Sequence, residues 1–134
     1  MAHTCTAVLI RCMDFRLTRD INIWLESQNL INDIDIISLA GAAKDIVDNP
    51  EGFLMNQIAL SVKLHEIKKV YILQHMDCGA YGGHASFDNE EIELTKYQEE
   101  INKAKSIIAA KFPQLEIIAG IIKEDSNNWR VEIV

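Results

Sequence analysis

The stretch VYILQHMDCG, residues 70–79, joins an apolar run to two side chains of the kind that bind metal ions. Its first four residues are β-branched, aromatic or aliphatic, and this composition predicts a buried strand over about residues 69–74. His75 and Cys78 follow the strand three positions apart, so both can reach one metal ion from its end. Taken alone, this histidine–cysteine pair is a weak signal, and its meaning depends on what lies beside it.

A second apolar run, AVLI at residues 7–10, ends in the sequence RCMDFR at residues 11–16. The thiol of Cys12 completes a set of two sulfurs and one imidazole with His75 and Cys78. Three protein ligands leave the fourth position of a tetrahedral zinc site free for water or substrate, which distinguishes catalytic zinc sites from structural ones. The sequence therefore predicts a Zn²⁺ site made by Cys12, His75 and Cys78.

The rest of the chain alternates between strand-like and helix-like patterns, which is typical of an α/β fold with a mostly parallel sheet. Helices on both faces of such a sheet give a three-layer α/β/α architecture. We expect strands at about residues 6–10, 35–39, 69–74 and 115–122, helices at about residues 18–28, 49–64 and 94–112, and a final strand at 129–134 that returns as a hairpin across Asn127-Asn128.

The connections between these elements predict the order of the strands. Right-handed crossovers, with strand two on one side of strand one and strand three on the other, give the order 2-1-3-4. The carboxyl ends of strands one and three then flank the topological switch point, where ligands bind in open sheets of this kind. Cys12 lies at the first of these ends, and His75 and Cys78 lie at the second, so the expected topology brings the three ligands together.

The composition limits the classes of protein to which the chain can belong. With 134 residues, 49% of them hydrophobic and 25% charged, it is expected to form a single domain over residues 1–134. No run is apolar enough to cross a bilayer and the N-terminus lacks a signal-peptide layout, so we expect a cytoplasmic protein without a membrane partner.

Three cysteines, an odd count, favour metal or catalytic roles over disulfides. A net charge of −7 with scattered lysines and arginines argues against a nucleic-acid partner.

The segment at residues 49–64 predicts a helix that is apolar nearly all round. Its start is indicated by Asn49-Pro50-Glu51, which combine a capping side chain, a proline for the first turn and an acid near the positive end of the helix dipole. A helix of this kind is usually covered on more than one side. In so small a domain a second subunit would provide the cover, and we expect a homodimer or a higher even oligomer.

Three motifs resemble those of the beta class of carbonic anhydrases. They are CMDFR at residues 12–16, similar to the Cys-x-Asp-x-Arg motif of that family, HMDCGA at residues 75–80, similar to its His-x-x-Cys-Gly motif, and Ala40-Gly41 after the second strand. The resemblance covers most of the chain. It implies a lyase with Zn²⁺ as cofactor, a carbonate dehydratase that reversibly hydrates carbon dioxide to bicarbonate through zinc-bound hydroxide.

The sequence also departs from the pattern of that family. The stretch SLAGA at residues 38–42 stands where the family usually has Arg-Asn-Ala-Gly-Asn. We expect no counterpart of the N-terminal helical arm of larger members, and the stretch between strands three and four is short. The chain therefore resembles a compact, divergent branch of the family.

The resemblance also implies roles for Asp14 and Arg16, which follow Cys12 by two and four positions. Arg16 is implied to hold Asp14 ionised through a bidentate ion pair, and Asp14 to orient the catalytic water. In a closed state of the same family, Arg16 releases Asp14, which then becomes the fourth zinc ligand. Asp14 is thus both a candidate catalytic residue and a candidate metal ligand.

Two other functions remain open beside the hydration of carbon dioxide. The first is a zinc-binding protein of the same fold in which Asp14 permanently closes the fourth position, and the second is a hydrolase of COS or CS₂ with the same ligands. Thiol redox and phosphatase chemistry are disfavoured. The chain has no Cys-x-x-Cys pair, and the spacing from Cys12 to Arg16 is Cys-x₃-Arg rather than the Cys-x₅-Arg loop that a cysteine phosphatase needs.

The remaining cysteine and histidines have no partner at ligand spacing. Cys5 is expected to be structural, and His3, His65 and His84 are expected to be solvated surface residues, with a proton-shuttle role for His84 as the less favoured alternative. We expect Asp77 to stabilise its loop by binding backbone amides.

Overall fold

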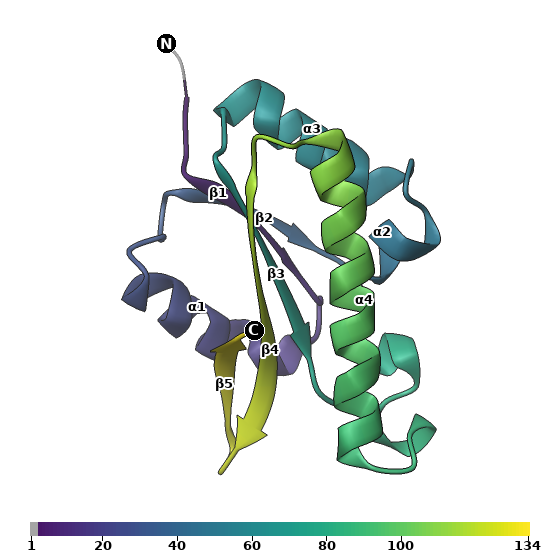
Figure 1. Cartoon of the computed structure of the whole chain (residues 1–134). Helices are drawn as coiled ribbons and strands as arrows, with labels where there is room; N and C mark the ends of the chain where they lie inside the picture. Colours follow the sequence, from purple (N-terminus) through teal and green to yellow (C-terminus); the bar gives the residue numbers. More distant parts are fainter. Residues whose placement is uncertain (1–2) are drawn as a thin grey trace.

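A five-stranded sheet runs through the centre of the protein, and helices flank it on both sides (Figure 1). The computed structural model describes residues 3–134. The strands are β1 (Ala7–Arg11), β2 (Ile34–Ser38), β3 (Lys69–His75), β4 (Glu116–Asp125) and β5 (Asn128–Ile133). The helices are α1 (Thr18–Ser27), α2 (Lys44–Asp48), α3 (Phe53–His65) and α4 (Glu90–Lys111), with short 3₁₀ turns η1 (Phe15–Leu17), η2 (Gly79–Tyr81) and η3 (His84–Ser86).

The strand order β2-β1-β3-β4-β5 confirms the predicted 2-1-3-4 core and adds β5 at one edge. The first four strands are parallel, and β5 pairs antiparallel with β4 in the expected hairpin. Ser126 and Asn127 form its turn with φ angles of 50° and 70°, the left-handed region that asparagine enters more readily than most residues. The register pairs Arg11, the last residue of β1, with Leu73 in β3, so the carboxyl ends of these two strands are neighbours.

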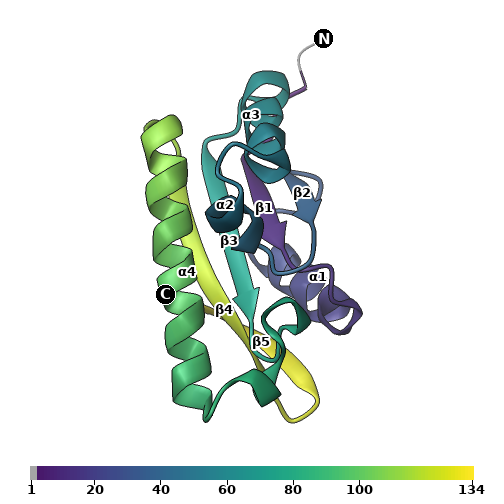
Figure 2. The ribbon, with the colours of Figure 1, turned by 90° about the vertical axis from the view of Figure 1, so that its right-hand side faces the viewer.

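The crossovers put α1 on one side of the sheet and α2, α3 and α4 on the other (Figures 1 and 2). Both central strands are therefore covered on both faces. All five residues of β1 are buried, and β3 is buried from Val70 to His75. Doubly covered parallel strands carry continuous rather than alternating apolar runs, which is the pattern that the sequence shows at both positions.

One predicted helix is wrong at its start. The chain forms α2 first, and α3 begins three residues after Pro50. The Asn49 side chain donates to Asp45 Oδ1 at 3.0 Å, and the Gly52 N–H donates to the Asn49 carbonyl at 2.9 Å, so a turn separates the two helices. The Asp45 carboxylate also accepts the Leu54 N–H at 3.2 Å. It satisfies an N–H at the start of α3, which is the role that the sequence assigned to Asn49.

The other predicted elements agree with the structure to within a few residues. Helix α4 starts at Glu90, earlier than predicted, because the Asn89 side chain accepts the Ile92 N–H at 2.9 Å and caps it. Strand β4 continues to Asp125, beyond the predicted end, because its last residues pair with β5.

The apolar helix α3 is covered on one side only within the chain. Leu54, Met55 and Ile58 are buried, whereas three of its other apolar side chains are exposed. The exposed side chains are Phe53 (62%), Leu60 (44%) and Leu64 (58%).

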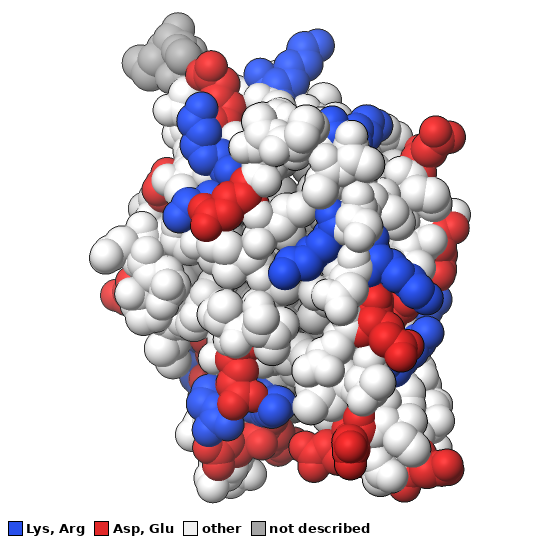
Figure 3. Space-filling model, in the orientation of Figure 1, with Lys and Arg blue, Asp and Glu red and all other residues white. Residues whose placement is uncertain are grey.

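On the face that Figure 3 shows, basic side chains lie among acidic ones, and a broad area without charged side chains lies between them. None of the helices within residues 3–134 combines the length and the apolar character that a membrane span requires.

Candidate metal centre

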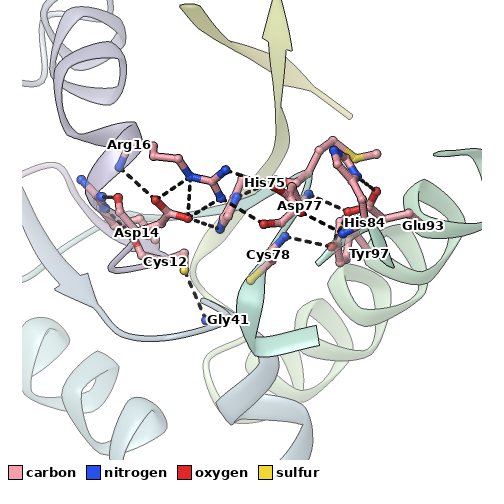
Figure 4. Close-up of polar contacts among 12 residues, drawn as sticks. Cys12, Asp14, Arg16, Gly41, His75, Asp77, Cys78, His84, Glu93 and Tyr97 are labelled. Carbon is pink, nitrogen blue, oxygen red and sulfur yellow. Dashed lines mark hydrogen bonds and ion pairs between the residues drawn. The ribbon is translucent and has the colours of Figure 1, made fainter. Parts of the chain in front are cut away.

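The three predicted zinc ligands lie together where β1 and β3 end (Figure 4). Cys12 directly follows β1, His75 is the last residue of β3, and Cys78 follows in the next loop. One ligand atom of each lies within 4.8 Å of the ligand atoms of the other two. All three residues are buried, with exposed fractions of 5%, 1% and 1%. This juxtaposition follows from the topology, because parallel neighbours bring their carboxyl ends to one edge of the sheet.

The imidazole of His75 is held in one tautomer. Its Nδ1 lies 2.8 Å from the Met76 carbonyl, and because a carbonyl only accepts hydrogen bonds, Nδ1 carries the proton. The lone pair is then on Nε2. Among the buried side-chain nitrogen and oxygen atoms of residues 3–134, this atom is the one without a hydrogen-bond partner. An unpaired buried acceptor costs about 1–3 kcal/mol. A metal ion bound by this nitrogen would remove that penalty.

The two thiols form a coupled pair. The side chain of Cys78 lowers the pKa of Cys12, and Cys12 together with burial raises the pKa of Cys78, so the first proton leaves the pair easily and the second with difficulty. The Gly41 N–H lies 3.5 Å from Cys12 Sγ and favours the thiolate. Arg11 is buried beside them, and its Nε donates to the Cys12 carbonyl at 2.8 Å.

This set of donors fits zinc. Two thiolates and one neutral imidazole are ligands that Zn²⁺ takes in tetrahedral sites, and three protein ligands leave one position open. Both cysteines are free of disulfides. The second ring nitrogen of His75 is bonded to a backbone carbonyl, an arrangement that metal-binding histidines commonly have.

Asp14 lies beside the three ligands and is held by Arg16. Arg16 donates from Nη2 to Asp14 Oδ2 at 2.7 Å and from Nε to Asp14 Oδ1 at 3.1 Å, a bidentate pair. These hydrogen bonds lower the pKa of Asp14 to about 2. Asp14 Oδ2 also lies 3.9 Å from His75 Nε2, so an ionised carboxylate oxygen faces the unpartnered nitrogen.

Arg16 is fixed on more than one side. Its Nη1 donates to Asp77 Oδ2 and its Nη2 to the Asp77 carbonyl, both at 3.1 Å. Its guanidinium lies over the Trp129 ring, 5.1 Å from the centroid, and the same ring packs edge-on against His75. The hairpin of β4 and β5 therefore helps to orient both His75 and Arg16.

A cleft of about 830 Å³ opens beside Cys12 and Asp14. Apolar or small residues form most of its wall, namely Met13, Phe15, Ala40, Gly79, Ala80 and Gly82. Met13 and Phe15 are 63% and 85% exposed. Asp14, Arg16 and Asp77 also line the cleft, so charged and apolar side chains meet in it.

Residues that the sequence analysis missed support the Cys78 loop from α4. Glu93 is 1% exposed, and its Oε2 accepts the Asp77 N–H at 2.6 Å and the Tyr97 O–H at 2.7 Å. The Tyr97 hydroxyl in turn accepts the Cys78 N–H at 3.3 Å. The available signal was spacing, because Glu93 lies four residues before Tyr97 and thus on the buried side of the helix.

His84 has a partner that the sequence did not predict. Its side chain is 57% exposed, as expected for a surface residue, but its Nδ1 bonds the buried Glu93 carboxylate at 2.5 Å, which raises the pKa of His84. Asp77 Oδ1 accepts the His84 N–H at 2.8 Å, in agreement with the predicted loop-stabilising role of Asp77. Cys5 and His65, which the sequence left without partners, lie with Asp35 at the other end of the sheet.

Comparisons of the sequence identify its relatives. Residues 2–134 match the model of a family described as "Putative carbonic anhydrase". An uncharacterized protein of Rickettsia conorii is 31% identical over 127 residues, which cover 90% of this chain and 68% of that protein. An uncharacterized protein of Rickettsia bellii is 33% identical over 127 residues, which cover 90% of this chain and 77% of that protein.

Solved structures with a similar fold are beta-carbonic anhydrases. Isoform I from Trichomonas vaginalis has a TM-score of 0.67 at 15% identity, over 98% of this chain and 84% of that chain. The beta-carbonic anhydrase CcaA has a TM-score of 0.70 at 13% identity, over 99% and 78%. A tetrameric enzyme from Sordaria macrospora has a TM-score of 0.67 at 14% identity, over 99% and 82%. The chain belongs to this carbonic anhydrase family, as a divergent member with the fold of the beta class.

Proposed function

We propose that the protein is a zinc-dependent carbonic anhydrase that interconverts carbon dioxide and bicarbonate, with Cys12, His75 and Cys78 as the zinc ligands. The observation that carries the proposal is the buried, unpartnered Nε2 of His75, which faces two thiols within 4.8 Å in a chain of the carbonic anhydrase family. A zinc ion bound there would act as a Lewis acid that lowers the pKa of a coordinated water and so supplies a nucleophile for carbon dioxide near neutral pH.

Asp14 and Arg16 have the central catalytic roles in this proposal. Asp14 is ionised at neutral pH, and Arg16 holds its pKa at about 2, so in this proposal its Oδ2 accepts a hydrogen bond from the reacting water and orients it. Two thiolate ligands offset the charge of a divalent cation, which makes such neighbouring groups important for the reaction. Arg16 keeps its own orientation through Asp77 and Trp129.

We also propose that Asp14 serves as a fourth zinc ligand when Arg16 releases it. Asp14 Oδ2 is already 3.9 Å from His75 Nε2, so a side-chain movement rather than a backbone rearrangement would bring it to the ligand set. In that state the carboxylate would occupy the coordination position that the reaction needs. A sample could then hold zinc fully and still catalyse little hydration of carbon dioxide.

The experiment that tests the proposal measures zinc content and carbon dioxide hydration together. The wild-type protein is expected to hold zinc and to catalyse hydration, while His75→Gln and Cys78→Ser are expected to lose hydration together with the zinc bound at this site. His3→Gln, a change at an exposed histidine away from the cleft, is the matched control and retains both. Wild-type protein with full zinc and no hydration at any pH would contradict the proposed carbonic anhydrase activity. Conversion of COS or CS₂ by the same sample would instead support the alternative of a hydrolase with the same ligands.

We propose in addition that the protein works as a homodimer or a higher even oligomer. The proposal is supported by the exposed apolar side chains Phe53, Leu60 and Leu64 on α3 and by Phe15 at the mouth of the cleft. Light scattering that finds a stable monomer at micromolar concentration would contradict it. A single domain over residues 1–134 and a cytoplasmic location stay predictions.

A further inference from the structure

A second group of metal-binding side chains lies at the opposite end of the sheet. Cys5 precedes β1, Asp35 is the second residue of β2, and His65 is the last residue of α3. One ligand atom of each lies within 4.8 Å of the ligand atoms of the other two. Because these residues flank the amino ends of the strands, none of them belongs to the group of Cys12, His75 and Cys78.

Hydrogen bonds hold the second group in place. The Cys5 N–H donates to the His65 carbonyl at 3.0 Å, which ties the two ligand-bearing residues together through the main chain. His65 Nδ1 lies 2.7 Å from Asp35 Oδ2, and the Ser61 hydroxyl donates to the same oxygen at 2.5 Å. The carboxylate therefore has a fixed direction, and the three side chains meet without any loop having to move.

The chemistry of the three donors points to a particular class of ion. A thiol, an imidazole and a carboxylate are the donor types that zinc uses, and hard cations such as Mg²⁺ and Ca²⁺ prefer oxygen alone. The Asp35 and His65 side chains are 29% and 37% exposed, so solvent can reach the group. A cavity of about 260 Å³, lined in part by Asp35, Ser61 and His65, adjoins it.

We propose that Cys5, Asp35 and His65 form a second site for a divalent cation of the zinc class, with the fourth position taken by water. The hydrogen bond between His65 Nδ1 and Asp35 Oδ2 is replaced by two bonds to the ion, which widens that separation from 2.7 Å to about 3.3 Å for tetrahedral ligands. Binding releases the Cys5 thiol proton to solvent, and the ring proton of His65 moves from Nδ1 to Nε2 by exchange with solvent, which frees the Nδ1 lone pair for the ion. The ion clamps the segment before β1 to β2 and α3.

The rate of alkylation of Cys5 by iodoacetamide, located by mass spectrometry, tests this site. Cys5 is partly exposed, whereas the other two cysteines are buried, so each thiol is followed separately. We expect saturating zinc to slow alkylation of Cys5 at least 10-fold in the wild-type protein, and elemental analysis to give two zinc ions per chain.

His65→Ala and Asp35→Asn are expected to remove the protection of Cys5 and one equivalent of zinc. His84→Ala, which breaks a different histidine–carboxylate pair outside the group of Cys5, Asp35 and His65, is the matched control and keeps the protection of Cys5. Unchanged alkylation of wild-type Cys5 in saturating zinc would overturn the proposal even if the variants fail to fold. Protection that persists in both His65→Ala and Asp35→Asn would also overturn it. Neither result depends on whether the protein hydrates carbon dioxide.

Discussion

The two ends of the sheet carry similar side chains in opposite states. At the carboxyl end, Cys12, His75 and Cys78 are buried, and the Nε2 of His75 has no hydrogen-bond partner. At the amino end, His65 is hydrogen bonded to Asp35 and both are part-exposed. The first group is therefore destabilised without an ion, whereas the second is stable without one. The comparison predicts that an ion bound at the carboxyl end would contribute more to the stability of the fold than an ion bound at the amino end.

Removal of zinc provides the largest test of this difference. A chelator is expected to lower the free energy of unfolding by about 4 kcal/mol, relative to protein in free zinc at about 1,000 times the dissociation constant. We attribute most of this loss of stability to the carboxyl end, where removal of the ion leaves an unpaired nitrogen and two buried thiols. Thermal unfolding with and without chelator measures it for wild-type protein and His75→Gln. An equal chelator effect in both proteins would show that the amino end dominates instead.

A change at Asp14 tests whether metal binding and catalysis can be separated. Asp14→Asn is expected to reduce the rate constant for carbon dioxide hydration about 10- to 100-fold while zinc remains bound, since outer groups around metal sites commonly have effects of this size. An amide keeps the shape but loses the charge that Arg16 holds. Stopped-flow hydration assays with parallel zinc analysis measure both quantities. Loss of zinc together with activity would mean that Asp14 acts mainly as a ligand.

The buried support beneath Cys78 is the next most sensitive feature. Glu93→Gln is expected to cost about 1–3 kcal/mol of stability, because the amide gives up one of the acceptor oxygens that bind Asp77, Tyr97 and His84. Urea unfolding measures this change. Glu99→Gln on the exposed side of the same helix is the matched control and is expected to change stability very little. Similar effects of the two changes would contradict the supporting role.

The smallest expected effect is a pH dependence at His84. Glu93 raises the pKa of His84 above its ordinary value of 6.5, so the pair stabilises the fold fully below about pH 6.5 and loses this contribution as the pH rises through the raised pKa. Because the His84 side chain is 57% exposed, the contribution is below about 1 kcal/mol. The difference in unfolding free energy between wild type and His84→Gln should shrink from about pH 5 to about pH 9. A constant difference would contradict this assignment.

The sequence was sufficient to predict the carboxyl-end group because two independent signals agreed. The apolar runs fixed where β1 and β3 end, and the crossover rule made those ends neighbours, so Cys12 and His75 had to converge. The amino-end group gave no such signal. Cys5, Asp35 and His65 are about 30 residues apart along the chain, and only the final packing of α3 against β2 brings them together.

One predicted helix start was wrong and one buried acid was missed, and contacts that are distant in sequence explain both. Asn49-Pro50 carries a helix-start pattern, yet Asp45 from the preceding helix satisfies the first free N–H of α3, so the pattern is used in a turn instead. Glu93 lies with Glu90 and Glu91 in the first turn of α4, where acidic side chains interact favourably with the helix dipole. This pattern is typical of exposed acids. The Glu93 carboxylate binds two donors from a loop nine or more residues away, Asp77 and His84, and the local sequence does not reveal these two contacts.

The hydrogen bond between His75 and the Met76 carbonyl has a consequence for how mutations act on this protein. Because the acceptor belongs to the main chain, no exchange of the side chain at position 76 can delete it. The position of the imidazole proton is thus insensitive to the side chain at position 76, and substitutions there leave the lone pair on Nε2, where the proposed ion would bind.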